Sequence, residues 1–116
     1  MRKRFFEMQI RGVGLMVSFA DRAESLPHVL VRFLDKESVL LNLETERYFG
    51  LDEIGTRMWQ LVTTAPSIDA AYRELQREFD VEPELLRLHL TELLGRLVGN
   101  GLLQIQPENV GTVSAV

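Results

Sequence analysis

Short runs of hydrophobic residues separated by polar turns make up the first patterned part of the chain. Residues 29–34, 38–43 and 47–51 are three such runs, rich in valine, leucine and aromatic residues. Short β-rich runs between tight polar turns are typical of antiparallel strands joined in sequence order. The pattern therefore predicts a three-stranded antiparallel meander.

After the third run the period changes, because apolar residues then recur every three or four positions, as on one face of a helix. The first predicted helix is capped by Asp52 and stopped at Pro66, since the residue before a proline avoids the helical region. Ser67 caps the second helix, and Pro83 opens the third in the first-turn position that proline favours. Residues 99–101, Gly-Asn-Gly, supply the left-handed conformation that ends a helix.

The predicted order of three strands and three helices, followed by a short apolar segment at 102–105, defines the fold class. It is a small α+β domain of the winged helix-turn-helix type, in which the helices cover one face of the sheet. We expect the domain to span 28–105. Residues 1–27 would be an N-terminal arm, either weakly ordered or an extra strand, and 106–116 a tail. Trp59 is expected in the core.

The charge of the chain argues against the DNA binding for which winged helices are known. The 116 residues carry a net charge of −4, and 23–98 hold eight basic and fourteen acidic residues. The third helix has three glutamates against Arg87 and Arg96, whereas DNA-reading helices need basic residues to meet phosphates. A DNA-binding transcription regulator therefore remains an alternative that the charge disfavours.

No set of residues suited to catalysis is visible. The chain has no cysteine, and His28 and His89 are isolated from each other in the sequence. There is no nucleophile with a base, no metal-ligand spacing and no phosphate-binding loop. We therefore expect a protein that is not an enzyme, without metal or cofactor. No apolar run approaches the roughly 18 residues that span a bilayer, so we expect a cytoplasmic protein without membrane association.

The N-terminal segment allows other interpretations. Residues 1–11 carry a charge of +3 and precede a nine-residue apolar run at 12–20, an arrangement that resembles a weak signal peptide. Two glycines and a serine dilute this run, which favours an arm over an export signal. Met8 and Met16 also leave open a later start. An edge strand in this arm would allow a homodimer.

Residues 39–59 resemble the signature of the PqqD-like family. In that family a strand and turn lead into a helix reading x-x-G-x-x-[IVM]-W-x-L. The run here contains Tyr-Phe-Gly-Leu at 48–51 and the Gly55-x-x-x-Trp59 pair. The likeness continues through 67–105 and covers about two-thirds of the chain. Glu46 stands where the family often has glycine, and glutamate would strain a turn with a positive φ, which predicts a turn of another type.

The segments Ser-Val-Leu at 38–40 and Val-Thr-Thr at 62–64 differ from those of the true coenzyme PQQ proteins. The latter tend to carry Pro-Glu-Gly and Cys-Asp-Gly at these places. The chain looks more like the discrete leader-binding proteins of lasso-peptide and related gene clusters.

The resemblance implies non-catalytic binding of the leader of a ribosomal precursor peptide, which is then presented to modifying enzymes. Such enzymes would be a leader protease, an ATP-dependent cyclase or a radical SAM enzyme. In the family the leader adds as a strand beside the third strand and packs against the third helix, a form of β-augmentation. Carried over to this chain, the resemblance implies the following binding residues. The pairing edge would be Arg47, Tyr48 and Phe49, the groove would be lined by Leu86, Leu90 and Leu93, and Arg87 would meet an acidic leader residue.

Two points stay open at this level. Most of the leucines on the third helix are expected in the core, and the sequence does not identify which of them face a groove. A structural subunit whose acidic face docks a basic enzyme, with the leader bound elsewhere, is a further alternative.

Overall fold

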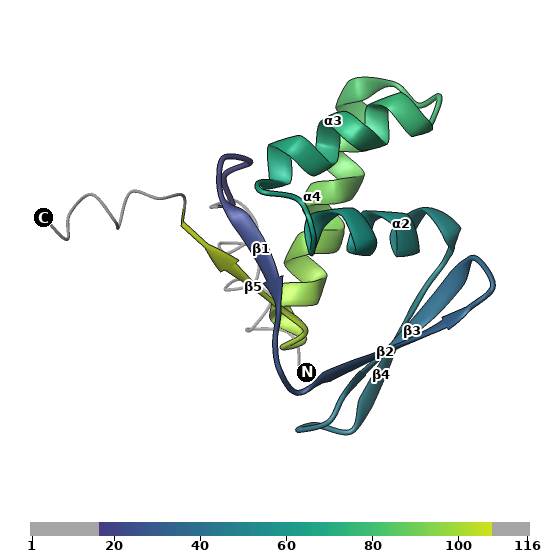
Figure 1. Ribbon diagram of the computed structural model, residues 1–116, viewed down its shortest axis with the longest axis vertical. Helices are drawn as coiled ribbons and strands as arrows, with labels where there is room; N and C mark the ends of the chain where they lie inside the picture. The colour runs from purple at the N-terminus through teal and green to yellow at the C-terminus, as the bar shows by residue number, and fades with distance from the viewer. Residues whose placement is uncertain (1–16, 108–116) are drawn as a thin grey trace, which may run out of the picture.

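The computed structural model of the protein describes residues 17–107. In chain order the elements are β1 (Arg22–Ser25), β2 (Val29–Leu34), β3 (Glu37–Asn42), β4 (Arg47–Leu51), α2 (Glu53–Val62), α3 (Ile68–Glu78), α4 (Pro83–Gly99) and β5 (Leu103–Gln106). The fold is α+β with a three-stranded meander followed by three helices, and the predicted class is confirmed (Figure 1).

β2, β3 and β4 form one antiparallel sheet in this order, so that β3 is central and β4 is an edge strand. Residues 35–36 and 43–46 make the two turns. β1 and β5 form a separate two-stranded antiparallel sheet in which Ala23 lies opposite Ile105. In Figure 1 the helices lie above the three-stranded sheet, and the β1–β5 pair lies to one side of α4.

The helices begin where their capping residues predict. The Asp52 carboxylate accepts a hydrogen bond from the Gly55 amide at 2.8 Å, and Ser67 Oγ accepts one from the Ala70 amide at 3.0 Å. Pro83 is the first residue of α4. α2 ends at Val62, before the predicted stop at Pro66, and the hydroxyls of Thr63 and Thr64 bond back to carbonyls of its last turn.

The core lies between the helices and the inner face of the sheet, and α4 contributes most to it. Leu86, Leu90, Leu94 and Leu97 are all 1% exposed or less. Trp59 is buried in this cluster, as predicted. Close packing of this kind fixes where α4 stands relative to the sheet, and so positions the space between α4 and β4.

The segment before residue 28 takes part in this core. Phe19 and Ala23 are buried, and the amides of Ile68 and Asp69 at the start of α3 donate to the carbonyls of Asp21 and Phe19. The proposed division of the chain at residue 28 therefore separates residues that pack together. The parts of the expected arm and tail at 1–16 and 108–116 lie outside the described residues, and so does the arm through which a dimer was expected.

The turn between β3 and β4 differs from the expectation. Glu46 has a φ of 63°, so the positive-φ position where the family often has glycine is kept, and the prediction of another turn type is wrong. The turn is held by the Asn42 carbonyl, which accepts from the Glu46 amide, and by Asn42 Oδ1, which accepts from the Glu44 and Thr45 amides. These bonds hold a glutamate in a conformation that costs about 1–2 kcal/mol for a side chain with a Cβ.

Asn42 also ties this turn to the end of α4. Its buried amide nitrogen donates to the Asn100 carbonyl at 3.0 Å and lies 3.4 Å from the Gly101 carbonyl. Gly101 has a φ of 70°, and a Cβ there would come within 3.0 Å of this same nitrogen. The start of β4 and the end of α4 are therefore fixed relative to each other.

Candidate functional site

The free edge of β4 exposes main-chain hydrogen-bonding groups. In an antiparallel pair, successive residues point their N–H and C=O groups alternately to one side and the other. Leu43 bonds His28 beside β2, and the Asn42 carbonyl faces the turn into β4. Odd-numbered residues of β3 therefore bond β2, and even-numbered ones bond β4. The pairing of Leu40 with Phe49 then leaves Tyr48 and Gly50 facing the open edge.

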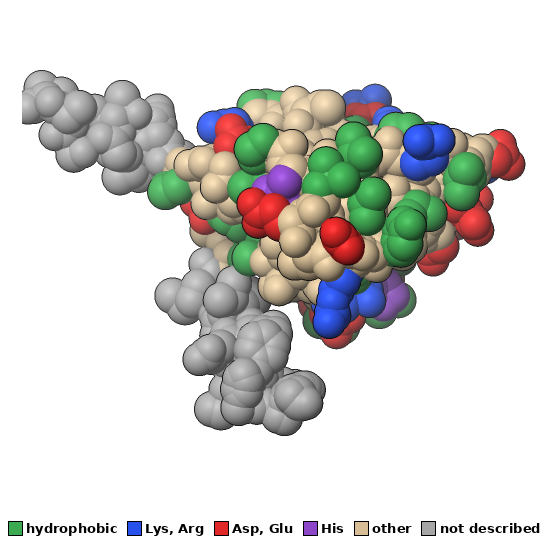
Figure 2. All heavy atoms as spheres, turned by 90° about the horizontal axis from the view of Figure 1, so that it is seen from below, with side chains coloured by type: hydrophobic (Ala, Val, Ile, Leu, Met, Phe, Trp, Pro, Cys, Tyr) green, Lys and Arg blue, Asp and Glu red, His purple; other side chains and the backbone are tan. Residues whose placement is uncertain are grey.

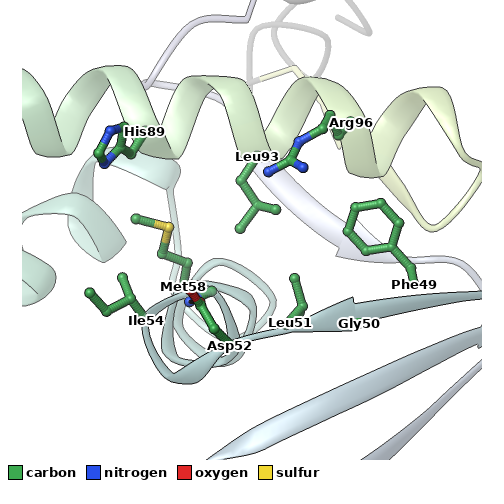
Figure 3. Close-up of a pocket in the computed structure, with 10 residues that line it drawn as sticks. Phe49, Gly50, Leu51, Asp52, Ile54, Met58, His89, Leu93 and Arg96 are labelled. Carbon is green, nitrogen blue, oxygen red and sulfur yellow. Dashed lines mark hydrogen bonds between the residues drawn. The ribbon is translucent and has the colours of Figure 1, made fainter.

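A groove of about 390 Å³ follows this edge and separates it from α4. From the sheet side it is lined by β4 and α2, with Phe49, Gly50, Leu51, Asp52, Ile54, Gly55 and Met58. From the other side it is lined by His89, Leu93 and Arg96 of α4. Figure 3 shows these side chains pointing from the two walls toward one another, with Leu93 and Arg96 above β4 and His89 above α2. The groove therefore combines apolar side chains with polar groups of the backbone and of Asp52, His89 and Arg96.

α4 offers this groove only one of its faces. His89, Leu93 and Arg96 lie four and three residues apart, which places them on one side of a helix. Leu86 and Leu90 lie on the neighbouring stripe and are fully buried in the core, at 1% and 0% exposure. Of the three leucines expected to line the groove, the structure places only Leu93 there, because the other two are buried in the hydrophobic core.

Arg87 lies on the far side of α4 from the groove. It precedes Arg96 by two and a half helical turns, and its guanidinium carbon sits 3.9 Å above the Phe19 ring and 5.4 Å from the Tyr72 ring. A guanidinium held over two aromatic faces in this way is a cation–π contact. Arg87 therefore packs α4 against the N-terminal segment and α3, and its position outside the groove does not support the expectation that it meets an acidic leader residue.

The three expected edge residues are distributed over different surfaces. Phe49 is half-buried and lines the groove, and Tyr48 is 74% exposed on the opposite face of the sheet. Arg47 lies at the start of β4, beside the end of α4, where it borders a separate hollow together with Asn100 and Gly101. Alternate residues of β4 therefore form two surfaces. Tyr48 and Gly50 present main-chain groups at the open edge, and the side chains of Phe49 and Leu51 line the groove.

The outer face of the sheet carries a second apolar surface. The paired residues Leu30, Leu41 and Tyr48 cross it in one row, and Leu34 lies on the same face at the end of β2, opposite Glu37. Leu30 and Leu34 are about half exposed, at 52% and 54%. Figure 2, which looks at the molecule from below, shows apolar side chains gathered over the sheet. Contiguous apolar surface of this kind is typical of a protein contact.

Residues 17–107 show no grouping of three or more histidine, aspartate or glutamate side chains that could hold a metal ion. Within this same part of the chain, none of the helices is long and apolar enough to cross a membrane. His28 is occupied structurally, since its Nε2 lies 3.0 Å from the Gly101 carbonyl oxygen.

Leu51, Ile54, Met58, His89 and Arg96 line the groove but were not among the residues expected there. A helical projection of α4 would have placed His89 and Arg96 beside Leu93. The sequence gives no comparable signal for Ile54 and Met58, which share the apolar stripe of α2 with the core residue Trp59. Which residues of that stripe face the groove and which face the core depends on where α4 crosses α2.

The fold and this site define a class of protein: a small winged-helix domain with an open sheet edge beside a groove that contains both apolar and polar residues. The family model for coenzyme PQQ synthesis protein D (PqqD) matches residues 37–103, and the chain belongs to this family. It is similar to a solved structure of TbiB1 in complex with the TbiA(beta) leader peptide, with 30% sequence identity and a TM-score of 0.64. The match covers 70% of this chain and 94% of that one. No curated protein sequence matches the chain significantly.

Proposed function

We propose that this protein binds the leader of a ribosomally made precursor peptide during the biosynthesis of a modified peptide product. The observation that carries the proposal is the open edge of β4 beside the groove. Family membership and the similarity to a leader-peptide complex support it. Proteins of this family are generally non-catalytic, and the DNA-binding alternative finds no support.

In the proposed complex the leader is an added strand of the sheet. Its main chain bonds the N–H and C=O groups of Tyr48 and Gly50, which the register of β4 on β3 turns toward the open edge. Alternate side chains of the leader then point into the groove, toward Phe49, Met58 and Leu93. Main-chain bonds supply affinity for any extended peptide, and the groove selects its sequence.

The outer face of the sheet leaves room for a second partner. Because the leader occupies the β4 edge and the groove, the row from Leu30 to Tyr48 stays open in the complex. We propose that a modifying enzyme is brought to the bound precursor in the cytoplasm. A leader protease, an ATP-dependent cyclase and a radical SAM enzyme are the candidates that the family resemblance implies.

The experiment is a calorimetric titration of the protein with a synthetic leader, taken from any short peptide encoded next to its gene. The informative variant is Gly50→Pro, which removes the edge-facing N–H. We expect it to weaken binding about tenfold or more, because proline is accepted on an edge strand but cannot donate a hydrogen bond. Circular dichroism checks that the variant is folded.

The matched control is Gly50→Ala. A Cβ at this position would meet nothing within 4 Å, and alanine keeps the N–H, so leader binding should stay within about twofold of wild type. Equal binding by the folded proline and alanine variants would overturn strand addition at this edge. Failure of the wild-type protein to bind the leader, together with salt-dependent binding of duplex DNA, would overturn the proposed function itself.

A further inference from the structure

Arg96 is the basic residue that the groove presents to a bound peptide. It lies in the last turn of α4, is exposed, and holds its guanidinium carbon 5.8 Å from the centre of the Phe49 ring. Figure 3 shows it reaching from α4 over the β4 side of the groove. A guanidinium at the side of a peptide-sized groove is a site where a ligand carboxylate would find a charged hydrogen-bond donor.

No acidic residue of the described chain neutralises Arg96. Glu92 stands one turn earlier on the same helix, yet the ion pairs among residues 17–107 include neither of the two. The helix end stabilises a cation in the last turn, but this contribution is small and leaves the guanidinium donors available.

Arg47 at the start of β4 borders the separate hollow beside the end of α4, and three other arginines make contacts elsewhere. Arg57 pairs with Glu78, Arg73 pairs with Asp69, and Arg87 is stacked on aromatic rings. None of these three borders the groove. Among the described residues, Arg96 is therefore the arginine that lines the groove.

The opposite end of the groove has a different character. Asp52 lines it there, but its carboxylate is engaged by the Gly55 amide as the cap of α2. His89 lies across from it, seven residues and about two helical turns from Arg96. The groove thus has an arginine at the Phe49 end, whereas the only basic side chain of the described residues that lines the Ile54 end is that of His89.

We propose that Arg96 determines which peptides bind, because its guanidinium pairs with an acidic side chain of the bound peptide. An apolar side chain next to that acidic residue would pack against Phe49 and Leu93. This inference rests on the proposed function, because it names the ligand of the same groove. It assigns to Arg96 the role that the family resemblance had implied for Arg87. The favoured ligand class is an extended peptide with an aspartate or glutamate at one defined position.

The test uses a phage-displayed library of random dodecapeptides, selected separately on the wild-type protein, on Arg96→Glu and on Arg73→Glu. Wild type should enrich peptides with an acidic residue at a fixed spacing from an apolar one. Arg96→Glu should lose this preference and favour lysine or arginine at the same position. Arg73→Glu is the matched control, since it makes the same charge change on α3, away from the groove, and should keep the acidic preference.

Affinities of one selected acidic peptide then measure the effect. Replacing its acidic residue by the corresponding amide should weaken binding to wild type about three- to fivefold, as expected for a partly exposed ion pair. The same replacement should leave binding to Arg96→Gln unchanged. The specificity role is overturned if wild type and Arg96→Glu select the same peptides. If wild type selects no peptides from the library and also fails to bind the leader, the proposed function fails, and this inference fails with it.

Discussion

Phe49 takes part both in the packing of the sheet against the core and in the proposed binding site. Its side chain is half-buried on the inner face of β4 and lines the groove below Arg96. Aromatic residues in such positions often carry a large share of the binding energy in a protein contact. Phe33 offers a matched phenylalanine on the same face of the sheet, but it is 49% exposed and borders no part of the groove.

We predict that Phe49→Ala weakens leader binding about tenfold, whereas Phe33→Ala leaves it within about twofold. Both affinities are measured by calorimetry at a temperature where each variant is folded. Comparable losses for the two substitutions would show that the groove is not where the leader side chains bind.

Glu46 shows how a single residue can depart from its favoured conformation. Its φ of 63° is one that glycine adopts freely. We predict that Glu46→Gly raises the free energy of unfolding by about 0.5–1 kcal/mol, since relief of the strain outweighs the added freedom of the unfolded chain. Urea unfolding measures this change. Glu44→Gly, in the same turn without a positive φ, is the control and should not stabilise the protein.

At the level of single residues, local chemistry was predictable and tertiary position was not. Asp52, Ser67 and Pro83 start their helices as expected, because a cap depends on neighbours in sequence. Arg87 and Arg96 look alike in sequence, and only the placement of α4 shows that one is stacked on aromatic rings while the other borders the groove.

Among the elements, α2 and α3 are joined by an ion pair between their exposed sides. Arg57 Nε and Nη2 donate to the two carboxylate oxygens of Glu78 at 2.8 and 2.7 Å. The hydrogen bonds from Arg57 lower the pKa of Glu78 below its ordinary value. A folded-state pKa below the unfolded one stabilises the protein above the unfolded pKa, and this contribution is lost as the pH falls through the folded pKa.

We therefore predict that wild type loses more unfolding free energy than Arg57→Gln when the pH falls from about 5 to about 3. The difference should stay below about 1 kcal/mol, because both side chains are partly exposed. Urea unfolding at several pH values measures it. Arg32→Gln, which makes the same charge change without removing an ion pair of the described residues, should follow wild type, and a parallel loss in all three proteins would refute the prediction.

The elements themselves were largely predictable, since strand alternation and helical periodicity are properties of short windows. The pairing of β1 with β5 could not be predicted, because residues 22–25 and 103–106 are far apart in the sequence and no local pattern links them. The end of α2 at Val62 was not predicted either, because a proline marks where a helix can no longer continue and does not exclude an earlier end.

For the whole molecule, the segment before β2 completes the core. Phe19 packs edge to face on Tyr72 with ring centroids 5.5 Å apart, and it lies beneath Arg87. We predict that a chain of residues 28–105 is less stable than one of 17–107 by at least about 3 kcal/mol, because it lacks Phe19 and the partner strand of β5. Urea unfolding of the two chains measures the difference, and equal stability would place the domain boundary at residue 28.

The central claim is that a peptide adds to the sheet at β4. Amide hydrogen exchange, followed by NMR with and without the leader peptide, tests it most directly. The Tyr48 and Gly50 amides face the open edge, whereas the Phe49 amide faces β3. Leader binding should slow exchange strongly at Tyr48 and Gly50 and change it little at Phe49. Saturable binding that leaves Tyr48 and Gly50 as exchangeable as in the free protein would contradict strand addition.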